Sequence, residues 1–149
     1  MIWLLVFVLA LTGCGPKPAP APQPKPDPTK EAWYGETTKQ LAAIAREADA
    51  AFRHGQKEQT AALIEKGQPL IHRLLSAPYP TLEAMEAVSD LDELYGRMLL
   101  SNGRYAWARV FFQKNLTRWS LWKPRTADTQ RRLETAKGAA AECDRHIGE

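Results

Sequence analysis

The chain has 149 residues, of which 44% are hydrophobic and 25% are charged, and its formal net charge is +3. This average charge content and normal apolar share exclude disorder for most of the chain. The charge is unevenly spread, because residues 14–93 hold nine Lys or Arg against twelve acids, whereas residues 94–149 hold eleven against five. The basic half indicates either a solvated helical face or a surface for an acidic partner or anionic lipid.

An apolar segment opens the chain. Residues 2–11 are apolar or small, and this run is about half the length of roughly twenty residues that a membrane-spanning helix needs. It has the length of the apolar core of a secretory signal. It ends in a small-residue box followed by a cysteine, Leu11-Thr12-Gly13-Cys14. No Lys or Arg precedes it, so either the amino group of Met1 supplies the positive charge or the true start lies upstream.

This order of apolar segment, small residues and cysteine resembles a bacterial lipoprotein signal. The resemblance implies that residues 1–13 are a removed signal peptide and that Cys14 becomes an acylated N-terminus held in a bilayer. Gly15 follows the cysteine where some inner-membrane lipoproteins have aspartate, which favours the periplasmic face of an outer membrane. Such a location argues against nucleic acid as a partner. The alternatives are simple secretion and a buried N-terminal segment.

Prolines alternate with other residues from Pro16 to Pro28. Proline lacks an amide donor and disfavours the helical region for the residue before it, so this stretch predicts an extended polyproline helix. Its reach is on the order of 40 Å at about 3.1 Å per residue. We therefore interpret residues 14–28 as a lipidated cysteine and disordered proline-rich tether. A ligand for a proline-recognition domain is the alternative.

Residues 29–149 predict a single all-α domain of about five helices, with no alternating strand pattern. The apolar spacing places these helices at about residues 29–53, 57–76, 81–100, 104–120 and 126–147. Asp27-Pro28, Thr81 and Pro124 give start signals, and Gly55 and Gly103 give stop signals. Pro69 predicts a kink or break in the second helix.

The fourth expected helix is apolar on two sides, because Trp107, Val110 and Phe111 widen the stripe that contains Phe112. Such a helix is expected to be sandwiched between neighbours. The fifth helix carries a narrow stripe that includes Cys143, which suits a terminal capping helix with a buried, inert thiol. With Cys14 assigned to lipid, no disulfide is expected within the mature chain.

The third and fourth helices resemble a tetratricopeptide repeat. The resemblance rests on three motifs, Gly96-x-x-Leu99, Gly103-x-Tyr105 and Ala108-x-x-x-Phe112. Small Gly96 and Ala108 would let the helices approach, with Tyr105 and Phe112 filling the gaps beside them. A weaker copy follows the same offsets at Ala48, Ala51, Gly55, Thr60 and Ile64. The resemblance implies two antiparallel hairpins and a cap that bind peptides on a concave face; the alternative is an unrelated five-helix bundle.

No sequence motif indicates catalysis. The histidines His54, His72 and His146 are far apart, and no zinc motif, Gly-rich phosphate loop or Gly-x-Ser-x-Gly elbow is present. Asp90 and Glu93 share one helical edge, which we interpret as solvated charge rather than an acid–base pair. We therefore expect no enzyme, no catalytic residue, no metal and no cofactor.

The most suggestive stretch runs from Trp119 to Arg125, between the fourth and fifth helices. Tryptophan and arginine are favoured anchors of protein interfaces. Trp119 is expected to pack internally, whereas Trp122 suits either packing or a partner. The partner-binding candidates and their basic rim are Trp119, Trp122, Arg104, Arg109, Lys114, Arg118 and Arg125.

These patterns together predict a membrane-anchored envelope lipoprotein that presents a helical-repeat domain to another envelope protein, as an assembly or accessory factor. The alternative function is binding of an anionic envelope ligand through the basic, tryptophan-containing surface.

Overall fold

The computed structural model describes residues 26–148. The predicted signal peptide, Cys14 and most of the predicted tether lie outside these residues. Within them the chain is all-helical, as predicted, with a short 3-10 helix η1 and no strand. The helices are η1 (Pro28–Lys30), α1 (Ala32–Arg53), α2 (Lys57–Leu75), α3 (Leu82–Ser101), α4 (Tyr105–Leu121) and α5 (Ala127–Ile147). None of these helices is both long enough and apolar enough to cross a membrane.

Local signals set most helix ends. The hydroxyl of Thr81 accepts a hydrogen bond from the amide of Ala84 (3.3 Å) at the start of α3. Thr126 and Thr129 cap each other's backbone at the start of α5. Gly55 and Gly103 end α1 and α3 with φ of 71° and 69°, a conformation that glycine adopts without strain. The five predicted helices are thus confirmed to within a few residues.

Two boundary predictions differ from the structure. The carboxylate of Asp27 accepts from the amide of Thr29 (3.0 Å) and caps η1 instead of α1, which begins at Ala32. Of the kink or break predicted at Pro69, the structure excludes the break, because α2 continues through this residue. Pro69 is exposed, so the carbonyl of Glu65, which loses its amide partner, can be hydrated.

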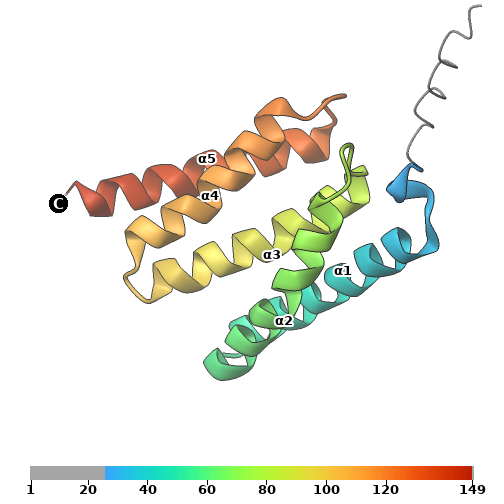
Figure 1. The fold of residues 1–149 in the computed structure, drawn as a ribbon. Coiled ribbons are helices and arrows are strands. Elements are labelled where there is room, and N and C mark those ends of the chain that lie inside the picture. Colours follow the sequence, from blue (N-terminus) through green and yellow to red (C-terminus); the bar gives the residue numbers. More distant parts are fainter. Residues whose placement is uncertain (1–25, 149) are drawn as a thin grey trace, which may run out of the picture.

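Successive helices reverse direction, and the array runs from the α1–α2 pair through α3 to the α4–α5 pair (Figure 1). Helix α1 contacts α2 and α3, α3 contacts α4, and α4 contacts α5, whereas α2 touches α3 only lightly. Helix α3 therefore lies in the middle of the array, between the α1–α2 pair and the α4–α5 pair (Figure 1). This arrangement leaves hollows beside α3 where helices of the two pairs face each other without extensive contact.

The larger apolar core joins α1, α2 and α3. Its fully buried side chains include Leu41, Leu74, Val88 and Leu91. Gly67 of α2 lies at the centre of this core, because a Cβ there would come within 2.2 Å of the Leu91 side chain. The first three helices thus share the larger of the two apolar cores.

A smaller apolar core joins α4 and α5 around Phe112, Ala108, Ala140 and Cys143. The Phe112 ring fills the space beside Gly96, where a Cβ would lie 2.7 Å from the ring, as the sequence predicts. Tyr105 differs from the prediction: its ring stacks on His146 of α5 with 4.2 Å between centroids. Cys143 is a buried free thiol, and burial raises its pKa.

Candidate functional site

Trp119 and Arg118, two of the candidate partner-binding residues, lie inside the fold. Trp119 is 1% exposed, and its indole N–H donates to the hydroxyl of buried Ser89 (2.8 Å). The Arg118 side chain is 8% exposed and donates to the carboxylate of buried Asp92 (2.9 Å). Trp119 thus packs internally, as the sequence predicts, whereas Arg118, predicted to lie in the basic rim, is ion-paired between α4 and α3. The sequence could not reveal the ion pair of Arg118, because Asp92 lies 26 residues earlier in the chain.

Trp122 and Arg125 stabilise the connector between α4 and α5. The ring of half-buried Trp122 meets the ring of Trp119 edge-on, with 6.3 Å between centroids. Arg125 donates to the carbonyl of Ser120 (2.8 Å) and to the side chain of Gln130 (3.3 Å). A guanidinium that binds the last carbonyls of a helix acts as a C-terminal cap.

The remaining cations of the predicted rim stay on the surface. Arg109 pairs with Asp144 of α5, Lys114 lies 4.4 Å above the Phe111 ring, and Arg104 is exposed at the N-cap of α4. Of the seven candidates, Arg109, Lys114 and Arg118 line one common groove. Trp119, Trp122, Arg104 and Arg125 do not line it. The two tryptophans of the alternative hypothesis, an anionic ligand on a basic surface, therefore lie outside this groove.

Helix α4 keeps an exposed apolar side. It contacts α3 and α5, but Trp107 remains 65% exposed and Val110 46% exposed. The expected sandwich is thus incomplete, because no further helix of the described chain covers this side. Leu121 continues the same exposed side and is 74% exposed.

This side of α4 forms one wall of a groove of about 720 Å³ whose other wall is α2. Helix α2 contributes Ile71 and the 43% exposed Leu75, and α4 contributes Val110. The volume falls within the range of roughly 300–1,000 Å³ that is typical of ligand sites. We call this hollow the α2–α4 groove.

Polar groups accompany the apolar walls of the α2–α4 groove. Of its three cations, Arg109 is paired with Asp144 and Arg118 with Asp92, so Lys114 supplies the positive charge that forms no ion pair among the described residues. The side-chain amide nitrogen of Gln68 is buried and has no hydrogen-bond partner among the described residues. A buried donor without an acceptor is costly, and a ligand oxygen would remove that cost.

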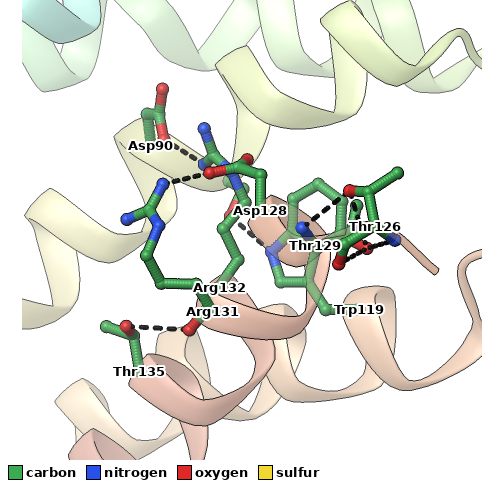
Figure 2. A network of polar contacts seen from close by, with 9 residues as sticks. Asp90, Trp119, Thr126, Asp128, Thr129, Arg131, Arg132 and Thr135 are labelled. Carbon is green, nitrogen blue, oxygen red and sulfur yellow. Dashed lines mark hydrogen bonds and ion pairs between the residues drawn. The ribbon is translucent and has the colours of Figure 1, made fainter.

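A network of charged side chains joins α5 to α3 on a different face (Figure 2). Arg132 contacts Asp90 of α3 (2.5 Å) and Asp128 of its own helix (2.7 Å). Its guanidinium carbon lies 5.5 Å from the centre of the Trp119 ring. Asp90 is exposed, as the interpretation of solvated charge expects, and it is ion-paired. Glu93 differs from that interpretation, because it is partly buried and this burial raises its pKa.

Among residues 26–148, no group of three or more His, Cys, Asp or Glu side chains is placed to hold a metal ion. The chain matches no protein-family model, and no curated protein or solved structure is significantly similar to it.

Proposed function

We propose that this chain is a membrane-anchored envelope lipoprotein whose helical domain docks a protein partner in the α2–α4 groove. The exposed apolar side of α4 carries this proposal. Val110 and Leu75 lie on opposite walls of the groove, and each side chain is nearly half exposed. The size of the groove suits a peptide segment. Contiguous exposed apolar surface with a polar rim is typical of interaction sites.

The occupant that fits best is an amphipathic helix with an acidic flank. Its apolar side chains would contact Ile71, Leu75 and Val110, which lie on two neighbouring helices. Its carboxylates would meet the excess of positive charge around Lys114. A backbone or side-chain oxygen would accept from Gln68. Binding of an amphipathic helix in an apolar groove is a recurring recognition mode, and complementary charge sets its orientation.

A tetratricopeptide-repeat-like arrangement of the hairpins, which is part of this proposal, would suit this role. The α1–α2 and α3–α4 pairs follow each other in sequence and each turns at a glycine, Gly55 or Gly103. Gly96 brings α3 close to the Phe112 ring, as the repeat resemblance implies. In this proposal α5 caps the array, and the domain provides a docking surface without catalytic chemistry or a cofactor.

The lipoprotein-like Leu11-Thr12-Gly13-Cys14 segment supports the anchoring part of the proposal. An acylated Cys14 at the periplasmic face of an outer membrane would hold the domain on a stiff proline tether. A partner in the same envelope would then meet the groove at a high effective concentration. This geometry suits an assembly or accessory factor of a larger envelope complex.

The experiment places a photo-crosslinking amino acid at Val110 or at Leu75 in the full-length protein expressed in its own cells. Both positions are partly exposed, so the replacement does not disturb the core. We expect both to capture the same protein, with the crosslinked peptide forming an acidic amphipathic helix. Lys114→Glu should reduce this capture severalfold because it reverses the attractive charge.

Exposed Lys137 on α5 provides the matched control position. Equal capture of the same protein from Lys137, or capture of only a second copy of this chain, would refute the docking proposal. Anchoring is tested separately: Cys14→Ala should move the protein from the membrane fraction to the soluble fraction. Retention of this variant in the membrane fraction would refute the acyl anchor while leaving the groove proposal testable.

A further inference from the structure

A second hollow lies between α1, α3 and α5, on the side of α3 that carries Asp90 and Glu93. Its volume is about 440 Å³, within the range of small-ligand sites. Five arginines from the three helices line it: Arg46, Arg53, Arg97, Arg131 and Arg132. We call this hollow the arginine cavity.

The arginine cavity has a surplus of positive charge. Its lining carboxylates are Asp49, Asp90 and Glu93, and Asp128 beside the cavity brings the balance to four carboxylates against five guanidinium groups. Asp49 is shared between Arg53 (2.7 Å) and Arg97 (2.5 Å). Asp128, next to the cavity, is likewise shared between Arg131 and Arg132. A carboxylate shared by two guanidinium groups cannot neutralise both.

Several donors in the arginine cavity remain unused. The Nε of Arg97 is buried and has no hydrogen-bond partner among the described residues. Exposed Arg46 forms no ion pair within the described part of the chain. Each guanidinium carries five N–H donors in a fixed plane, so the existing ion pairs leave donors for a further anion. Glu93, at 3.9 Å from Arg97, gives that guanidinium only a weak partner.

We propose that the arginine cavity binds a small phosphate-bearing anion. The guanidinium groups belong to three helices, α1, α3 and α5. Figure 2 shows two of them, those of Arg131 and Arg132 on α5, opposite Asp90 of α3. A phosphoryl group presents oxygens in several directions and can accept from all three sides, whereas a carboxylate presents two oxygens in one plane. Arginine is the preferred residue for such recognition because its donors pair with two oxygens at once. This site is separate from the α2–α4 groove and does not depend on the proposed function.

The test is calorimetric titration of the full-length protein in neutral detergent with inorganic pyrophosphate at low ionic strength. Arg46→Gln should weaken binding about fivefold, because it removes a charge-assisted donor without breaking an ion pair of the fold. Glu93→Gln should tighten binding, because it removes a carboxylate from the cavity. Arg145 is exposed on α5 and lies outside the cavity. Arg145→Gln is therefore the matched control and should leave the affinity for pyrophosphate unchanged.

The source of the phosphate is tested by replacing pyrophosphate with mixed micelles of phosphatidylglycerol, compared with phosphatidylcholine. Competition of the phosphatidylglycerol micelles with pyrophosphate, lost in Arg46→Gln, would identify a lipid headgroup as the ligand. Binding of pyrophosphate without such competition would identify a free phosphate compound. The absence of binding by either probe, or equal weakening by Arg145→Gln and Arg46→Gln, would overturn the proposal.

Discussion

Asp92 and Arg118 meet at 2.9 Å where water reaches little of either side chain. Arg118 also donates to the side-chain oxygen of Asn115, whose amide donates to the carbonyl of Ser89 (3.0 Å). Each member of this group is thus hydrogen-bonded, as buried polar groups must be to avoid a large desolvation cost. The group fixes the position of α4 on α3.

Removing one partner of this pair is therefore expected to be costly. Arg118→Met leaves the Asp92 carboxylate buried and unpaired, and should lower the free energy of unfolding by about 3–5 kcal/mol. The double variant Asp92→Leu with Arg118→Met should recover much of this loss because no charge remains buried. Urea unfolding measures both. A loss no larger than that of exposed Arg145→Met would contradict the assigned role.

Glu93 gives the stability of the fold a pH dependence. Burial raises its pKa above the ordinary value of 4.5, so the folded state holds this proton more tightly than the unfolded state. The contribution of protonated Glu93 to the free energy of unfolding is fully present at pH values below its pKa in the unfolded state. This contribution is lost as the pH rises through its pKa in the folded state. Ionised Glu93 at neutral pH therefore carries a cost that an uncharged side chain would avoid.

Glu93→Gln should consequently raise the melting temperature at pH 7 and change it little below pH 4, where the glutamate is already protonated. Thermal unfolding followed by circular dichroism at both pH values provides the measurement. Glu47→Gln on the exposed side of α1 is the control and should show no such difference. A melting temperature that falls at pH 7 would show that the Arg97 contact outweighs the cost of burial.

At the scale of the helices, local sequence signals predicted nearly all of the helix ends, which depend on neighbouring residues in the chain. Caps such as Thr81 and stop glycines such as Gly103 act within one turn, so the helix ends followed from the sequence. The candidate site did not, because its walls come from α2 and α4, more than thirty residues apart. The arginine cavity could not be predicted for the same reason. In the sequence, Arg46 and Arg131 look like ordinary surface residues, and nothing there shows that α1 and α5 face each other across α3.

The separation of α3 and α4 depends on one glycine. Gly96→Ala would place a methyl group 2.7 Å from the Phe112 ring, and this overpacking should destabilise the fold by about 1–3 kcal/mol. The control is Gly138→Ala in α5, where no atom lies within 4 Å of the added Cβ. That change should stabilise the protein by about 0.5–1 kcal/mol. Adding Phe112→Leu to Gly96→Ala should recover part of the loss.

Denaturant unfolding of the three variants compares them directly. Equal effects of Gly96→Ala and Gly138→Ala would mean that helix propensity, rather than contact with the Phe112 ring, determines the outcome at both positions.

At the scale of the whole molecule, stability is unevenly distributed. The larger apolar core belongs to α1, α2 and α3, whereas α4 and α5 share a smaller one that is supplemented by polar contacts. Regions with fewer buried apolar contacts open at lower free energy. We therefore expect the α4–α5 pair to open while the first three helices remain folded.

Hydrogen exchange followed by mass spectrometry measures this difference. Amides of α5 should exchange faster than those of α1 and α3, and Cys143→Ser should accelerate exchange in α5 without changing α1. This substitution places a hydroxyl at a fully buried position of the smaller core. Uniform acceleration along all five helices would instead show that the molecule unfolds as a single cooperative unit.

The central place of α3 has a thermodynamic consequence. Asp92 faces the α2–α4 groove and Asp90 the arginine cavity, so one helix is a shared wall of both hollows. A ligand that shifts α3 on binding in one hollow changes the affinity of the other hollow if the second ligand binds the two positions of α3 with different free energies. Linkage requires the effect to be reciprocal: the factor by which an anion alters partner affinity equals the factor by which the partner alters anion affinity. With such coupling through α3, the domain would respond to two ligands instead of serving only as a scaffold.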